Sequence, residues 1–155
     1  MIIKKYHNLQ LSIDDSLIQH MAELAIKHYP NEYGGILLGR YSSDLQCLQV
    51  HQYLLIDSYY SNSVEFVRQC SYTQEYFNHI FQENGLYYVG EWHSHPDSSA
   101  WFSVTDLQAM RNIALCHTVQ LENPILLILS ISEKILLDFN FFIFNENRLN
   151  LYESN

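Results

Sequence analysis

The chain has 155 residues, of which 48% are hydrophobic and 16% are charged, a length that supports one hydrophobic core but not two ordinary domains. Its formal net charge of -9, from 8 Lys and Arg against 17 Asp and Glu, argues against general binding to nucleic acid or anionic membranes. The aromatic content of 14% excludes a disordered chain, so we expect a single folded domain over residues 1–155.

Cysteine usage and the longest apolar run bear on location. Cys47, Cys70 and Cys116 are widely spaced and form no C-x-x-C pair, so we expect reduced thiols rather than a zinc ribbon or a redox motif. The N-terminus lacks the basic and apolar regions of a secretory signal. The longest apolar run, Pro124–Leu129, is too short to span a bilayer. We therefore expect a cytoplasmic protein with no membrane partner.

Apolar residues at helical spacing predict three helices. The first follows an acidic pair and ends at Tyr29-Pro30, since the residue before a proline disfavours helix. The second follows the capping-box pattern of Ser71 and Gln74 and ends at Asn84-Gly85, and the third spans residues 104–116. The apolar positions are Leu17, Ile18, Met21, Leu24 and Ala25 in the first helix, Tyr76, Phe77, Ile80 and Phe81 in the second, and Leu107, Met110 and Ala114 in the third.

The remaining apolar runs predict strands. The first two should pair as neighbours, and the run at residues 125–131 suits the centre of a sheet. A turn at 145–147 should lead into the last strand. Together with the helices these strands indicate an α/β fold, with a mixed, curved sheet flanked by helices. The predicted strands are Gly35–Gly39, Leu48–Ile56, Leu86 to about His93, Ile125–Ile131, Ile135–Phe144 and Leu149–Tyr152.

The segment GEWHSHPDSSAWFSVTD, residues 90–106, carries most of the predicted chemistry. His93 and His95 are two apart on a predicted strand, so both imidazoles point to the same side. Ser103 is placed to cap the third helix, and Asp106, in the first turn, could return toward the strand end. Two imidazoles and one carboxylate leave a fourth tetrahedral position open for water, which is typical of a catalytic zinc site.

Hydrolysis at such a site also needs a proton acceptor. Glu32, in NEYGGILLG, stands between the first helix and the next strand and is the best candidate. Alone it would be an ordinary surface acid, but the glycines at 34, 35 and 39 would let the backbone run close to a neighbour or a substrate.

Structural explanations compete with the functional ones. Taken alone, Ser103-x-x-Asp106 is more typical of a helix capping box than of a catalytic pair, and only the joint pattern reverses that. We expect Asp97 to face water. Seven aromatic residues are expected to be mostly core, with the last two as an alternative groove lining: Tyr59, Tyr60, Tyr87, Tyr88, Trp92, Trp101 and Phe102. The six remaining histidines have no partner at ligand spacing and are assigned no role: His7, His20, His28, His51, His79 and His117.

The combined pattern, H-x-H-P-x6-S-x-x-D preceded by E-x-x-G-x-L-x-G, resembles the JAMM motif of the JAB/MPN+ metalloprotease family. The resemblance implies a JAB/MPN-like fold, layered as in cytidine deaminases, over nearly the whole chain. It also implies that His93, His95 and Asp106 bind one Zn²⁺. Glu32 would be the general acid/base, and Ser103 would hydrogen-bond the developing oxyanion.

The GEWHSHP sequence is most similar to the bacterial branch of that family, including the JAB isopeptidases of anti-phage CBASS operons and mobile elements. This resemblance implies cleavage of conjugates made by a ubiquitin-like ligation system, whose activating and conjugating enzymes would be encoded nearby. The released protein would typically be a cyclic-oligonucleotide synthase, cut at its own C-terminus. Relatives often carry proline just before the motif serine, where Trp101-Phe102 stands here. Two alternatives stay open: a non-catalytic scaffold of the same fold, and a JAB peptidase of phage-tail, DNA-repair or sulfur-carrier type, for which the acidic charge disfavours the DNA version.

Overall fold

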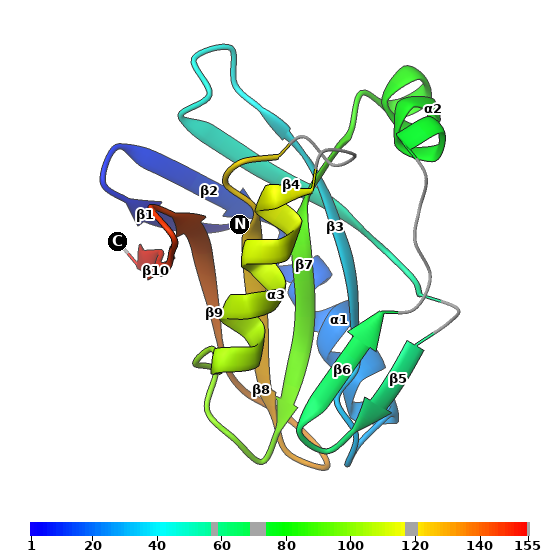
Figure 1. The fold of residues 1–155 in the computed structure, drawn as a ribbon. Helices are drawn as coiled ribbons and strands as arrows, with labels where there is room; N and C mark the ends of the chain where they lie inside the picture. Colours follow the sequence, from blue (N-terminus) through cyan, green and yellow to red (C-terminus); the bar gives the residue numbers. More distant parts are fainter. Residues whose placement is uncertain (57–58, 69–73, 117–120, 155) are drawn as a thin grey trace.

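The computed structural model describes residues 1–56, 59–68, 74–116 and 121–154. Nine strands form one curved sheet in the order β10-β9-β8-β7-β3-β4-β2-β1-β11, and β5 and β6 form a separate hairpin (Figure 1). The helices are α1 (Asp15–Lys27), α2 (Gln74–Asn84) and α3 (Val104–Leu115). The strands are β1 (Ile2–Tyr6), β2 (Leu9–Ile13), β3 (Gly34–Tyr41), β4 (Cys47–Leu54), β5 (Tyr59–Asn62), β6 (Glu65–Arg68), β7 (Tyr87–Pro96), β8 (Ile125–Ile131), β9 (Leu136–Asn145), β10 (Arg148–Leu151) and β11 (Glu153–Ser154).

Helices α1 and α3 cover opposite faces of the sheet (Figure 1). The alternation of side chains along β8 shows this directly, because neighbouring strand residues point to opposite faces. Leu127 packs in one cluster with Met21 of α1, whereas Leu126 packs in another with Met110 of α3. All seven residues of β8 are buried, as expected for a strand covered on both sides.

Strand β7 lies at the centre of this arrangement. It pairs antiparallel with β3 and parallel with β8, to which α3 provides the crossover connection. Gly34 of β3 lies opposite His93 of β7. A Cβ atom added to Gly34 would lie 2.1 Å from the carbonyl oxygen of Trp92, so only glycine allows the two strands to approach this closely. The start of β3 is thereby held against the strand that carries both histidines.

The C-terminal segment joins the two outer strands of the sheet. Residues 148–151 pair with β9, and residues 153–154 pair with β1. Tyr152, between them, is buried, and its amide donates to the carbonyl of Phe141 (2.9 Å). The Lys4 ammonium on β1 lies 5.2 Å from the centre of the Phe139 ring on β9. The described sheet is therefore bridged from edge to edge.

The predicted α/β fold with a mixed sheet is confirmed, as are all three helices. The predicted pairing of the first two apolar strands is also confirmed, as β3 with β4. The second of these strands ends at Leu54 rather than Ile56, and the histidine strand continues to Pro96. The hairpins β1–β2 and β5–β6 were not predicted. No helix in the described ranges is long and apolar enough to cross a membrane.

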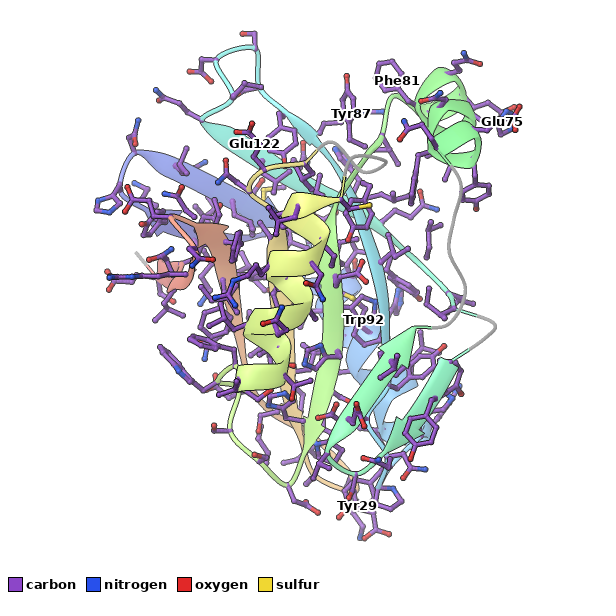
Figure 2. All side chains as sticks on the ribbon, viewed as in Figure 1. Tyr29, Glu75, Phe81, Tyr87, Trp92 and Glu122 are labelled. Carbon is purple, nitrogen blue, oxygen red and sulfur yellow. The ribbon has the colours of Figure 1, made fainter. Side chains whose placement is uncertain are left out.

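The prediction that most aromatic residues are core was wrong for several of them. Trp92 and Tyr88 are buried, but Tyr60 and Trp101 are about half exposed. Tyr87 is also about half exposed, and its ring centre lies 4.6 Å from that of Phe81 on α2 (Figure 2). For Tyr87 the reason is that only Ile80 of α2 is buried, so this helix covers little of the sheet.

Three predictions fall partly outside the described residues. They are the capping role of Ser71, the environment of Cys70 and the absence of a role for His117. Cys47 and Cys116 are exposed thiols outside any disulfide, as expected.

Candidate metal centre

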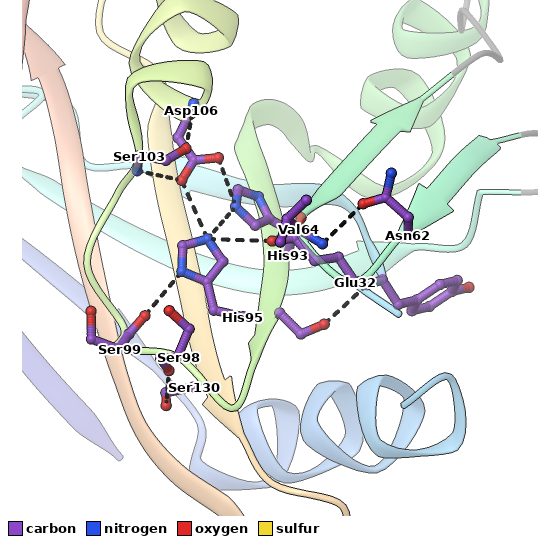
Figure 3. A network of polar contacts seen from close by, with 12 residues as sticks. Glu32, Asn62, Val64, His93, His95, Ser98, Ser99, Ser103, Asp106 and Ser130 are labelled. Carbon is purple, nitrogen blue, oxygen red and sulfur yellow. Dashed lines mark hydrogen bonds and ion pairs between the residues drawn. The ribbon is translucent and has the colours of Figure 1, made fainter. Parts of the chain in front are cut away.

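His93, His95 and Asp106 come together in one cluster (Figure 3). The two histidines extend from the same side of β7, as their spacing predicts. Their Nε2 atoms lie 3.2 Å apart. Asp106, in the first turn of α3, places Oδ1 3.0 Å from Nε2 of His93 and Oδ2 3.3 Å from Nε2 of His95. One candidate ligand atom from each residue lies within 4.8 Å of the others, so a single cation could contact all three.

The loop after β7 orients the His95 ring. Nδ1 of His95 lies 2.9 Å from the carbonyl oxygen of Ser99. A carbonyl can only accept, so Nδ1 carries a proton, and Nε2 is the nitrogen that faces the cluster. The loop itself is held by β8, because the Ser130 hydroxyl donates to the carbonyl of Ser98 (2.5 Å) and the Asp97 amide donates to that of Ile131 (2.8 Å).

Asp106 serves the helix cap and the cluster together. The Ser103 amide donates to Oδ2 of Asp106 (2.8 Å), and the Asp106 amide donates to Oγ of Ser103 (3.1 Å). This reciprocal pair is a capping box. Burial alone would raise the pKa of the Asp106 carboxyl, but hydrogen bonds from His93 and His95 outweigh it and hold that pKa well below its usual range. This direction favours the carboxylate form of Asp106, which is the form in which a carboxyl group binds a metal.

Glu32 is buried in the loop between α1 and β3, with Oε1 3.8 Å from Nε2 of His95. Burial raises the pKa of its carboxyl, although the nearby imidazoles oppose that shift. The β5–β6 hairpin fixes its backbone, since the Glu32 amide donates to the carbonyl of Asn62 (2.8 Å) and the Ser61 hydroxyl donates to the carbonyl of Glu32.

Ser94, which lies between the two histidines, ties the Glu32 loop to β7. Its side chain points to the opposite face, where Oγ accepts from the Tyr33 amide (3.0 Å). The Ser94 amide donates to the carbonyl of Tyr33 (2.8 Å). Glu32 is thus held from two sides, and the five residues singled out from the sequence meet at one place.

A cleft of about 290 Å³ opens beside the cluster, between α3 and the β5–β6 hairpin. Glu32, His93 and Asp106 are among its lining residues. Trp101 and Phe102 are not among its lining residues. Their rings stack with centres 5.5 Å apart and pack edge-on against Phe142. The predicted groove role of these two aromatic residues is therefore not supported for this cleft.

The cluster fits a catalytic zinc ion by its chemistry. Two imidazole nitrogens and one carboxylate oxygen are a donor set that Zn²⁺ accepts, and three protein ligands leave one position open. Asp97 is exposed and accepts a hydrogen bond from the Tyr29 hydroxyl instead of joining the cluster. Among the described residues, none of the other histidines belongs to the group.

Comparison with known proteins places the chain in a family. Residues 14–135 match the model of the prokaryotic homologs of the JAB domain, so the chain belongs to that family. It is 34% identical over 119 residues to a CD-NTase/cGAS isopeptidase of Enterobacter hormaechei subsp. hoffmannii (strain UCI 50). That match covers 76% of this chain and 65% of the relative, somewhat less than two thirds of the relative's length.

Solved structures share the fold at low sequence identity. A solution structure of a protein from Desulfitobacterium hafniense superposes with a TM-score of 0.67 at 20% identity, covering 92% of this chain and 90% of that one. A solution structure of a protein from Salinibacter ruber (strain DSM 13855) gives a TM-score of 0.55 at 20% identity, covering 93% and 88%. At this identity the similarity supports the JAB-like fold alone.

Sequence reasoning missed the residues that hold the site together. Ser61 and Asn62 fix the Glu32 backbone, and Ser99 orients His95. These contacts use a hydroxyl or backbone groups of residues with no recognisable spacing to their partners. The glycine pattern after Glu32 was the one available signal of a close approach in this region.

Proposed function

We propose that the protein is a zinc-dependent isopeptidase that acts as one domain over residues 1–155 and cleaves conjugates made by a bacterial ubiquitin-like ligation system. The observation that carries the proposal is the meeting of His93, His95 and Asp106 with buried Glu32 beside a cleft. Three metal-type ligands alone would suit a binding site, whereas a buried carboxylate beside them supplies the proton acceptor that hydrolysis needs.

The name of the 34% identical relative guides the choice of substrate. We propose a conjugate in which the C-terminal carboxyl of a cyclic-oligonucleotide synthase is joined to an amine of a target protein, in cytoplasmic anti-phage defence. Water adds across that amide bond, which releases the synthase with a free C-terminal carboxylate and the target with a free amine. The activating and conjugating enzymes of the ligation system are the expected partners.

The residues divide the work. His93, His95 and Asp106 would hold Zn²⁺, which when bound polarises a scissile carbonyl and lowers the pKa of water. Glu32 takes a proton from the attacking water and returns it to the leaving amine. The Ser103 hydroxyl accepts from the Asp106 amide and keeps its own proton, which it can donate to the oxyanion that forms at the carbonyl.

The test is incubation of the purified protein with such conjugates, with and without a zinc chelator. We expect intact-mass spectrometry to detect a synthase with an unmodified C-terminus, only in the samples without chelator, and recovery of cleavage when Zn²⁺ is restored. Glu32→Gln should be inactive, whereas the matched change Glu133→Gln on an exposed loop should not alter the rate. A protein that contains zinc, binds conjugates and leaves them intact would instead support the non-catalytic scaffold. Cleavage of other peptides alone would support the phage-tail or sulfur-carrier type.

A further inference from the structure

The cleft beside the metal cluster has the dimensions of a short peptide site. Its α3 wall runs from Thr105 to Ile113, about 12 Å at 1.5 Å per residue. An extended peptide advances about 3.3 Å per residue, so about four residues fit along this wall. The opposite wall is the β5–β6 hairpin, through Val64, Glu65 and Val67.

The charged groups that line the cleft are mainly negative. Four carboxylates line the cleft, and its described lining residues include neither lysine nor arginine. Asp106 and Glu32 lie against the imidazoles, and Glu91 accepts a hydrogen bond from the Tyr88 hydroxyl (2.6 Å). For Glu65 the described part of the chain shows no such contact. Glu65 and Glu32 line the same cleft, so a charge bound by Glu65 would lie beside the cluster.

The position of Glu65 is fixed by the hairpin. Its neighbour Phe66 packs against the ring of Tyr33, with ring centres 5.9 Å apart, so Glu65 and Val67 point away from that contact. The turn before Glu65 is closed by the Val64 amide, which donates to Oδ1 of Asn62 (2.9 Å) (Figure 3). The carbonyl of the same Asn62 receives the Glu32 amide. Glu65 is therefore held at a set distance from the cluster.

Exposed apolar surface lies on either side of Glu65. Val64 is 81% exposed and Val67 is 42% exposed. Lysine and arginine pack their aliphatic stems on apolar surface while the charged end meets a carboxylate. An acidic residue between two exposed valines offers both contacts to one such side chain.

We propose that Glu65 selects substrates that carry an arginine or lysine side chain in the segment bound along this cleft, next to the bond that is cleaved. The inference rests on the proposed function and adds the chemistry of the substrate segment. Because hydrogen bonds between charged groups are among the strong ones, we expect loss of this pair to lower kcat/KM by about tenfold or more.

The experiment uses short fluorogenic peptides with one arginine placed in turn at each position around the scissile bond, and matched peptides with glutamine or glutamate there. We expect the wild type to prefer the best arginine peptide over its glutamine counterpart by about tenfold. Glu65→Gln should abolish the preference, and Glu65→Lys should reverse it in favour of glutamate. Glu23→Lys, the same charge change on the exposed side of α1, should keep the wild-type preference.

Binding separates this inference from the proposed function. Fluorescence anisotropy measures how tightly the same peptide sequences bind to the Glu32→Gln protein and to the double variant Glu32→Gln/Glu65→Lys. Hydrolysis with no dependence on the peptide's charge would overturn the role of Glu65 and leave the isopeptidase intact. Absence of hydrolysis with arginine-dependent binding that Glu65→Lys removes would support Glu65 and count against the isopeptidase. Binding that ignores peptide charge would overturn the role of Glu65 in either case.

Discussion

One imidazole of the candidate metal cluster, that of His95, is oriented by the loop after β7. His95 has a carbonyl partner for Nδ1 and lies against Asp106 through Nε2, so its ring is already turned for an ion. We expect the purified protein to hold about one Zn²⁺ per chain and the His93→Ala/His95→Ala variant to hold none. Elemental analysis by mass spectrometry measures this, with His20→Ala, an exposed histidine on α1, as the control. Full zinc occupancy in the double variant would place the ion elsewhere.

Glu32 is buried and lies close to the cluster, and its proposed function is to accept and return a proton. In Glu32→Gln the amide fills the same space but cannot take a proton. We expect normal zinc content and a turnover lower by about 10²- to 10⁴-fold, the usual contribution of general acid–base catalysis. Single-turnover cleavage of a conjugate measures the effect. Cleavage at the parent rate would assign the proton transfer to another group.

At the scale of one element, Ser103 caps the first turn of helix α3. Ser103→Ala should lower the free energy of unfolding by about 0.5 to 2 kcal/mol through loss of the cap. It should also lower turnover by about 10²- to 10³-fold if the hydroxyl donates to the oxyanion. Urea unfolding measures the first effect, and turnover well below the melting temperature measures the second. A variant that is less stable but equally active would leave Ser103 as a cap only.

The contact between β3 and β7 depends on the absence of a side chain at Gly34. In Gly34→Ala the new Cβ would meet the Trp92 carbonyl and the Cβ of His93, so the strands must separate beside the cluster. We expect a lower melting temperature together with weaker zinc binding, measured by competition with a chromogenic chelator. Unchanged zinc affinity in a folded Gly34→Ala protein would show that the strand ends adjust independently of the histidines.

Secondary structure was predictable where one local pattern dominates. The stripe of α1 and the apolar run of β8 each identified an element to within a few residues. The β1–β2 hairpin was missed although Leu9, Leu11 and Ile13 alternate at strand period, because charged residues in β1 obscured the pattern. The β5–β6 hairpin has mixed residues and is stabilised through contacts with the distant Glu32 loop, which no local pattern reveals. Likewise the residues of the proposed site were found by motif, whereas the residues that position them were not.

At the scale of the whole molecule, the C-terminal segment forms the strands at both edges of the sheet, β10 and β11. Deleting residues 148–155 would expose one edge of β9 and uncover apolar core. Leu149 and Tyr152 are both buried, and burial of such side chains contributes about 1.5 to 3 kcal/mol each, a large share of a typical folding free energy of about 5 to 15 kcal/mol. We expect the truncated protein to unfold at much lower urea concentration and to aggregate, as unpaired strand edges promote association. An unchanged urea midpoint would mean that residues 1–147 are stable without the C-terminal segment.

The proposed zinc ligands all come from one strand–loop–helix unit, β7 to α3, whereas Glu32 comes from a separate segment of the chain that precedes β3 and is held in place by contacts with β7 and with the β5–β6 hairpin. The two halves of the centre can therefore fail separately. Local opening at the start of β3 would withdraw the base and leave the ion in place, so a stored or heated sample could retain its full metal content after its turnover had gone. Zinc stoichiometry would then overstate the concentration of competent enzyme. Counting active sites by a single-turnover burst is the sounder standard for comparing preparations.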